Sequence, residues 1–233
     1  MKYKRVLLKL SGESLAGGSQ NHGINLESAG YVADEIKKAL KKKVELGIVI
    51  GAGNLWRGAG KSIDRVTADY MGMLATIMNA LALRDILQTN GINARVQSAI
   101  DVSKIAELYV RDNALRYLDK GEVVIFAGGT SNPYFTTDTT AALRAAEIKA
   151  GVILKATQVD GVYTDDPKKN PRAKKYSTLS FDEAISRNLK VMDITAFSLC
   201  RENKIPIIVF DFYRPGNLAK ALSGENVGTL VTF

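Results

Sequence analysis

The chain has one cysteine, Cys200, and one histidine, His22, among its 233 residues. A single cysteine excludes an internal disulfide, and we expect a reducing, cytoplasmic setting. Zinc clusters of the Cys/His type are excluded for the same reason. His22 lies in a polar stretch and is expected to be solvated, which leaves no histidine for a serine-type triad. Chemistry in this protein must therefore rest on lysine, arginine, carboxylates and backbone amides.

Long apolar runs are also missing from the sequence. The apolar stretches are much shorter than the roughly 20 residues that span a bilayer, so we expect no membrane span. The N-terminal MKYKRVLLKLSGE begins with basic residues, but Lys9 interrupts its apolar segment and no small-residue cleavage site follows. It is therefore not interpreted as a signal peptide.

The charge is unbalanced, with 32 Lys and Arg against 24 Asp and Glu, a net charge of +8. Lysines cluster in 37–43 and 168–175, and the first cluster falls on the polar side of a predicted amphipathic helix. No aromatic platform or nucleic-acid-binding motif accompanies either cluster. We interpret both as solvated surface, with no specific nucleic-acid partner, although a basic surface also suits anionic substrates.

Predicted strands and helices alternate along the chain, which is typical of a mainly parallel sheet with helices on both faces. The expected strands are Lys4–Leu10, Val44–Ile50, Ala94–Ser98, Glu122–Phe126, Val152–Lys155, Ile207–Phe210 and Thr229–Thr232. The expected helices are Leu26–Leu40, Val66–Gln88, Ile105–Leu118, Thr139–Lys149, Phe181–Asn188 and Asp193–Asn203. No repeat or linker divides the chain, so we predict a single α/β domain over residues 1–233.

Polar and glycine-rich segments follow several of these strands: KLSGE, GAGN, AGGTSNP and KATQVDG. Ligands of such sheets bind beyond the carboxyl ends of the strands, so the four segments predict one composite site. The stretch 157–180 has turn-forming residues and no periodicity. A loop of this length in a compact domain is usually functional or disordered.

Two nucleotide-binding motifs are almost matched and fail on one residue each. A dinucleotide fingerprint in VIGAGNLW would need a third glycine where Trp56 stands. A P-loop ending in GAGKS would need glycine where Leu55 stands. Neither motif is assigned.

Six segments, taken together, carry a resemblance: LLKLSGE, VIGAGNLWRG, DYMGMLAT, GTSNPYFTTD, LKATQVDGVYTDDP and KVMD. In this order they resemble the bacterial uridylate kinases (UMP kinases) of the amino-acid kinase family, over Lys4–Phe233. The resemblance implies a three-layer αβα sandwich and phosphoryl transfer from ATP to UMP with Mg²⁺. It also implies a homohexamer, with the N-terminal part of the domain mainly at UMP and the C-terminal part mainly at ATP.

The resemblance assigns catalysis to Lys9, Asp138 and Arg57. A lysine at a strand end can offset charge on a transferring phosphoryl group, and Asp138 is expected to orient Lys9. Arg57 offers a fork-shaped phosphate donor. The residues implied at ATP are Lys9, Leu10, Ser11, Gly12, Gly53, Arg57, Lys155, Thr157, Tyr163 and Asp166.

At UMP the resemblance implies Gly51, Ala52, Asp69, Thr130, Ser131, Asn132, Pro133, Tyr134, Phe135, Thr136 and Thr137. Ala52 stands where the family usually has glycine. Simpler roles stay open for three acids: Asp69 as a helix N-terminal acid, and Asp138 and Asp193 as helix caps. No residue is expected to be a metal ligand, because Mg²⁺ would be held by phosphates and water.

Two other functions stay open beside this one. The first is a different phosphotransferase activity of the amino-acid kinase family. The second is a non-catalytic nucleotide sensor or nucleic-acid-binding regulator, which the net charge would suit. Inhibition by UTP, activation by GTP and discrimination against CMP are undecided, and the Met-rich Met71–Met78 segment is a candidate subunit contact.

Replacement of Lys9 by alanine is predicted to abolish most turnover while UMP still binds. The acceptor phosphate is largely dianionic near neutral pH, with a second pKa of about 6, so no general base is needed and the loss falls on charge stabilisation. Steady-state turnover and UMP binding of Lys9→Ala measure this. Near-normal turnover would show that the assigned role is wrong.

Overall fold

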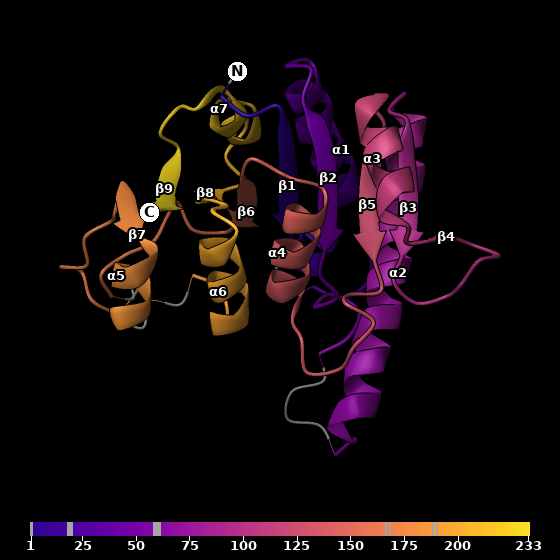
Figure 1. Ribbon diagram of the computed structural model, residues 1–233, viewed down its shortest axis with the longest axis horizontal. Coiled ribbons are helices and arrows are strands. Elements are labelled where there is room, and N and C mark those ends of the chain that lie inside the picture. Colours follow the sequence, from indigo (N-terminus) through magenta and orange to yellow (C-terminus); the bar gives the residue numbers. More distant parts are fainter. Residues whose placement is uncertain are drawn as a thin grey trace.

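The computed structural model describes residues 2–17, 21–57, 62–165, 167, 169–187, 189 and 191–233. It contains a nine-stranded sheet in the order β4-β3-β5-β2-β1-β6-β8-β9-β7 (Figure 1). The strands are β1 (Arg5–Leu10), β2 (Glu45–Ile50), β3 (Ala94–Ser98), β4 (Glu107–Leu108), β5 (Val123–Ala127), β6 (Ile153–Thr157), β7 (Thr178–Ser180), β8 (Ile207–Asp211) and β9 (Gly228–Thr232). Only β8 and β9 pair antiparallel among the described strands.

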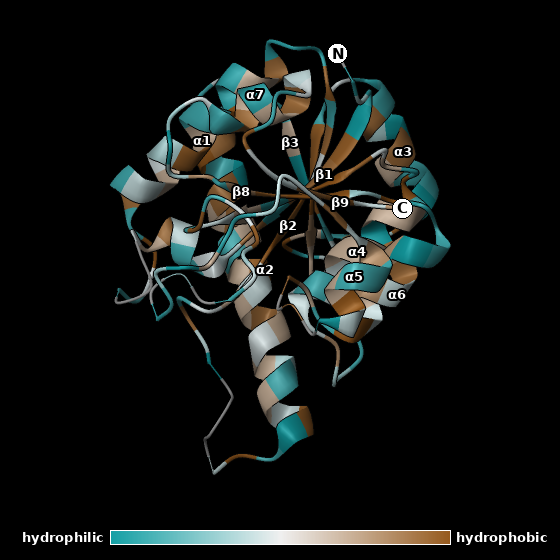
Figure 2. Ribbon diagram, turned by 90° about the vertical axis from the view of Figure 1, so that its left-hand side faces the viewer, coloured by the Kyte–Doolittle hydropathy of each residue, from teal (hydrophilic) through white to brown (hydrophobic). Residues whose placement is uncertain are grey.

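Seven α-helices and one 3₁₀ helix lie within the described residues. They are η1 (Gly12–Leu15), α1 (Leu26–Leu40), α2 (Arg65–Thr89), α3 (Arg111–Asp119), α4 (Thr137–Glu147), α5 (Phe181–Ser186), α6 (Ile194–Glu202) and α7 (Asn217–Ser223). Figure 2 shows α1, α2 and α7 on one side of the sheet and α3 to α6 on the other. The predicted three-layer αβα sandwich is therefore confirmed.

Each face of the sheet has its own apolar core. In β1, Val6 and Leu8 pack in the core beneath α1, α2 and α7, whereas Leu7 packs in the core beneath α3 to α6. Side chains alternate between the faces of a strand, so a strand covered on both sides reads as a continuous apolar run. The apolar runs VVIF (residues 123–126, in β5) and IIVF (residues 207–210, in β8) predict strands correctly for this reason.

One predicted helix is wrong in its first half. The sequence predicts a helix over Ile105–Leu118, but α3 begins only at Arg111. Glu107 and Leu108 instead form β4 and extend the sheet by pairing with Gln97 and Ser98. This pairing between strands outweighs the helical pattern of the segment.

Besides β4, three other short elements were not predicted: η1, β7 and α7. Strand β7 lies inside the stretch predicted to be an aperiodic loop. It consists of three residues, and its pairing with β9 decides its conformation. Ser180 caps the next helix, because its hydroxyl accepts the Glu183 N–H at 3.0 Å.

Helix α2 extends beyond the body of the sandwich (Figure 2). By length and composition alone it is apolar enough to cross a bilayer, a property that core helices share. Its buried residues pack on the sheet, whereas Tyr70, Met71, Leu74 and Met78 are exposed.

In the opposite helix layer, Cys200 is fully buried, and burial raises the pKa of its thiol to about 12. A buried thiol of this kind is unreactive, because the thiolate is the nucleophilic form.

The β8–β9 pairing requires glycine at position 228. A Cβ there would lie 2.0 Å from the Val209 carbonyl oxygen, so Gly228→Ala is expected to lower the free energy of unfolding by about 3 kcal/mol. Gly30→Ala is the control: no atom within 4 Å meets its Cβ, and alanine in a helix should stabilise by roughly 0.5–1 kcal/mol. Thermal denaturation of both variants measures the difference. A Gly228→Ala protein as stable as its parent would contradict the pairing.

Candidate active site

Three charged side chains meet at the carboxyl ends of the two central strands. Lys9 in β1 and Lys155 in β6 are register partners, so both project to the same face of the sheet. Asp138, in the first turn of α4, lies between them: its carboxylate is 2.7 Å from Lys9 Nζ and 2.6 Å from Lys155 Nζ. We call these three residues the ion cluster. It confirms the expected contact between Asp138 and Lys9 and brings Lys155 to the same place.

Burial and charge oppose each other in the ion cluster. Each side chain keeps only 13–15% of its surface exposed. Burial by itself would raise the pKa of the Asp138 carboxyl, but the Lys9 and Lys155 ammonium groups hold it below its usual value. Burial also lowers the pKa of Lys155, with Asp138 opposing the change and Lys9 adding to it. The cluster thus presents a net positive charge in a partly dehydrated place, which suits an anionic ligand.

The N-terminus of α4 is capped by Thr136, so the alternative role of Asp138 as that cap is wrong. The Thr136 hydroxyl accepts the N–H groups of Asp138 and Thr139 at 3.0 and 3.2 Å, and donates to Asp193. Asp193 also accepts from the Thr139 hydroxyl at 3.0 Å. In addition Asp193 caps α6, through the Ala196 N–H at 2.8 Å. Capping, the simpler role left open for Asp193, is confirmed, and it also joins two helices.

The two glycine-bearing turns after β1 and β2 pack directly on one another. A Cβ on Gly12 would lie 2.7 Å from the Gly51 carbonyl oxygen and 2.9 Å from the Gly53 nitrogen, so only glycine fits there. Ser11 caps η1 by accepting the Glu13 N–H. The Leu10 side chain is buried in the core, and its carbonyl accepts the Gly51 N–H, so only the backbone of Leu10 lies near the turns.

Arg57 follows the second of these turns and is half-exposed. Its Nε donates to the Gly53 carbonyl at 3.0 Å, and its guanidinium pairs with Glu13. The guanidinium is thus held beside the Ser11–Gly12 turn. His22 is exposed in the connection between η1 and α1, as predicted.

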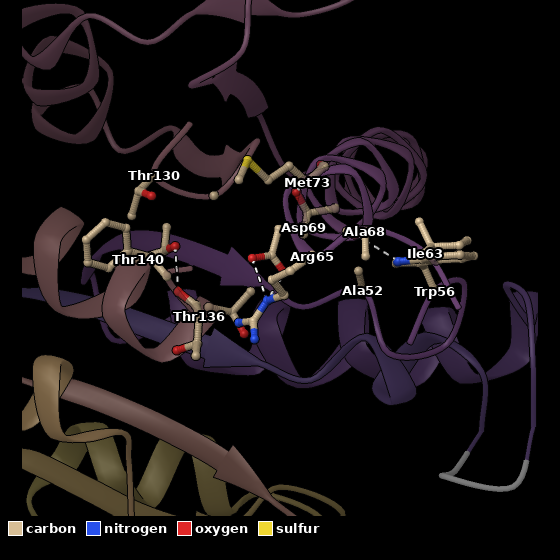
Figure 3. Close-up of a pocket in the computed structure, with 15 residues that line it drawn as sticks. Ala52, Trp56, Ile63, Arg65, Ala68, Asp69, Met73, Thr130, Thr136 and Thr140 are labelled. Carbon is tan, nitrogen blue, oxygen red and sulfur yellow. Dashed lines mark hydrogen bonds and ion pairs between the residues drawn. The ribbon is translucent and has the colours of Figure 1, made fainter. Parts of the chain in front are cut away.

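A cavity of about 590 Å³ opens between the N-terminal half of α2 and the loop before α4 (Figure 3). We call it the α2 cavity. Its lining includes six predicted residues: Ala52, Asp69, Thr130, Phe135, Thr136 and Thr137. Asp69 accepts from Arg65 Nε at 2.9 Å and from the Tyr134 N–H at 2.7 Å. The carboxylate therefore ties the loop to the helix at the cavity wall.

Five other predicted residues stand outside this lining: Gly51, Ser131, Asn132, Pro133 and Tyr134. Asn132 bonds within its own loop, because its side chain donates to the Thr130 carbonyl. Ser131 and Tyr134 have φ values of 64° and 72°, which non-glycine residues rarely adopt. These residues shape the loop around the cavity.

A second cavity of about 570 Å³, the β6 cavity, lies on the other side of the ion cluster. It is lined by three of the residues that the resemblance implies at ATP, Lys155, Thr157 and Tyr163. Asp166, the remaining residue predicted there, lies outside the described residues. Lys155 lines the β6 cavity, and its partner Asp138 directly follows Thr137, which lines the α2 cavity. The ion cluster therefore borders both cavities.

Several residues of the α2 cavity were not predicted, among them Trp56, Ile63, Arg65, Ala68, Gly72, Met73, Thr76, Gly129 and Thr140. A signal for the helical ones was present. Gly72, Met73 and Thr76 follow Asp69 by three, four and seven positions, and such spacing places them on one face of a helix. Trp56, after the turn that follows β2, and Gly129, in the loop before α4, have no such helical spacing to Asp69.

Asp138→Asn is expected to destabilise the protein by about 3 kcal/mol near pH 7, because two buried ammonium groups lose their carboxylate. The pKa of Asp138 is lowered in the folded state, so its stabilising effect is complete above about pH 4 and is lost as the pH falls through the folded-state pKa. The difference in melting temperature between parent and variant should therefore shrink from pH 6 to pH 3. A difference that stays constant with pH would contradict this account.

Comparison with known proteins agrees with the geometry. The family model described as amino acid kinase family matches residues 4–211. The structure of UMP kinase from Bacillus anthracis has 41% sequence identity and a TM-score of 0.96, covering 100% of this chain and 97% of the other. UMP kinase from Ureaplasma parvum has 40% identity and a TM-score of 0.92, with 100% of both chains covered. Uridylate kinase from Archaeoglobus fulgidus has 31% identity and a TM-score of 0.74, with 97% and 99% covered. The chain belongs to the amino acid kinase family.

Proposed function

We propose that this protein transfers the γ-phosphate of ATP to UMP and so forms ADP and UDP. The observation that carries the proposal is the ion cluster between two nucleotide-sized cavities, since transfer between two anionic substrates needs positive charge between them. The similarity to UMP kinases at about 40% identity over whole chains selects the acceptor.

The α2 cavity, built mainly from the N-terminal part of the domain, is the proposed UMP site. Asp69 offers carboxylate oxygens to the ribose hydroxyls, in exchange for part of its contact with Arg65. The loop residues Thr130, Thr136 and Thr137 offer hydroxyl groups, and Phe135 offers apolar surface for the base. The N-terminus of α4 faces the same cavity and favours an anion.

The β6 cavity, built mainly from the C-terminal part, is the proposed ATP site, with Thr157 and Tyr163 beside the adenosine and Asp166 as a ribose acceptor. ATP would carry Mg²⁺, which supplies charge neutralisation on the phosphates. The described residues contain no group of three or more His, Cys, Asp or Glu side chains that could hold a metal ion. Asp138 and Asp193 are already engaged by lysines, threonines and a helix N-terminus. Phosphate oxygens and water are therefore the proposed ligands of the ion.

In the proposed reaction, an oxygen of the UMP phosphate forms a bond to the γ-phosphorus of ATP, and the bond to the β–γ bridging oxygen breaks. Lys9 stabilises the charge on the transferring group, Lys155 lies on its ATP side, and Asp138 keeps both ammonium groups in place. Arg57 leaves Glu13 to contact phosphate, next to the backbone amides of Ser11, Gly12 and Gly53. No group needs to remove a proton from the acceptor.

The proposal extends to assembly and regulation. The exposed apolar residues Tyr70, Met71, Leu74 and Met78 of α2 support a subunit contact within a cytoplasmic homohexamer. UTP, which shares the uridine of UMP, is the proposed inhibitor, and GTP is the proposed effector.

A coupled assay that detects ADP release tests the function directly. With ATP and Mg²⁺, UMP is expected to support turnover on the order of 1–1,000 s⁻¹, whereas acetylglutamate stays at background. CMP in the same assay measures base discrimination. Turnover with acetylglutamate in place of UMP would favour a different activity of the family. DNA binding that weakens with salt, without any turnover, would favour the regulator.

A further inference from the structure

Two buried asparagines lie beneath the glycine-bearing turns and have no role in the proposed chemistry. Asn54 follows β2 and Asn79 lies midway along α2, and at most 1% of either residue is exposed. Neither lines the α2 cavity or the β6 cavity. Any effect they have on a ligand must therefore pass through the backbone that they hold.

The two carboxamides bond to each other in both directions. Asn79 Nδ2 donates to Asn54 Oδ1 at 2.7 Å, and Asn54 Nδ2 donates to Asn79 Oδ1 at 3.0 Å. The remaining N–H groups donate to main-chain carbonyls, that of Asn79 to Gly51 at 2.7 Å and that of Asn54 to Gly23 at 2.7 Å. Each amide hydrogen thus has an acceptor, which fixes the orientation of both side chains.

This pair is in contact with three segments that surround the site. Gly23, in the connection before α1, bonds to Asn54 through both of its backbone groups. Its carbonyl accepts from the Asn54 side chain, and its N–H donates to the Asn54 carbonyl at 2.9 Å. A Cβ on Gly12 would lie 2.3 Å from Asn54 Oδ1, so the turn after β1 rests directly on the pair. Gly51 is held by Asn79 through its carbonyl and by Leu10 through its N–H.

The carbonyl of Gly51 and the N–H of Ala52 belong to one planar peptide unit and point in opposite directions. Asn79 draws the Gly51 carbonyl toward α2, and the Ala52 N–H therefore points away from that contact. Ala52 lines the α2 cavity (Figure 3). Among the described residues, no acceptor pairs with the N–H groups of Ala52 or Gly53, so two adjacent backbone donors are free. Such free amides suit an anion.

We infer that Asn79 is a positioning residue, which aims the Ala52 N–H at the phosphate of the acceptor nucleotide by holding the Gly51–Ala52 peptide in one orientation. The identity of that nucleotide rests on the proposed function, whereas the orientation of the peptide does not. Asn54 completes the arrangement by fixing the Asn79 amide and supporting Gly12. The small difference at position 52 is then tolerated, because an alanine offers the same N–H as a glycine.

Asn79→Leu tests the inference, because leucine is similar in size and has no donor. At saturating ATP, the KM for UMP is expected to rise about 10- to 100-fold, the effect of losing one hydrogen bond to a charged group, while the KM for ATP changes less than about twofold. Leu83→Ala is the matched control: Leu83 is fully buried one turn further along α2 and lies in the core. Destabilisation alone should lower the active fraction and leave the KM for UMP unchanged.

If Asn79→Leu folds poorly, Asn79→Ser is measured in the same way, with a smaller rise of the KM for UMP expected. A folded variant that keeps the parent KM for UMP would overturn the inference. A crystal structure of the variant separates this result from the proposed function. The Gly51–Ala52 peptide should turn or take two orientations, even if the parent does not phosphorylate UMP. A peptide in its original orientation would also overturn the inference.

Discussion

The site depends on one constraint: two lysines from neighbouring strands share a single carboxylate in a place with little water. Removing an ammonium or carboxylate group from water costs several kcal/mol even after the protein relaxes. Asp138 offsets this cost for both lysines at once, with contacts of 2.7 and 2.6 Å. It can do so because the parallel register brings Lys9 and Lys155 side by side and the first turn of α4 passes over them. A net positive charge remains, and it is oriented before any ligand arrives.

The surroundings of the cluster restrict its movement. Thr136 and Asp193 tie the start of α4 to the start of α6, and Lys155 also donates to the carbonyl of Val191 from the segment before α6. The position of Asp138 is thus shared between two helices. On the other side of β1, the asparagine pair holds the glycine-bearing turns from below. Buried polar networks of this kind fix a geometry best when every member is satisfied. In the asparagine pair each side-chain N–H has an acceptor.

The two cavities differ in how they are built. The α2 cavity is formed by a long helix and a loop with two strained residues, Ser131 and Tyr134, and Asp69 connects the two parts. The β6 cavity is formed by a strand end and the irregular chain that follows it. A loop that carries strain needs support from a rigid element, and α2 provides it. The same helix thus supports the α2 cavity, anchors Asn79 and presents an apolar surface to solvent.

Much of this protein was determined by its sequence alone. Continuous apolar runs predict the strands and periodic apolar residues predict the helices, because both signals lie within the segment itself. Glycines after strands, together with Lys9, indicate a phosphate site, because the carboxyl ends of parallel strands lie at one edge of the sheet.

Other features were set only by the tertiary structure, because they depend on contacts between separate elements of the chain. Glu107 and Leu108 form a strand because they pair with β3. Lys155 joined Lys9 because of a register between strands far apart in the chain, and Thr136 capped α4 in place of Asp138. Asn79 gave no signal in the sequence, because its partners lie 25 and 28 positions away and meet it only in the folded chain.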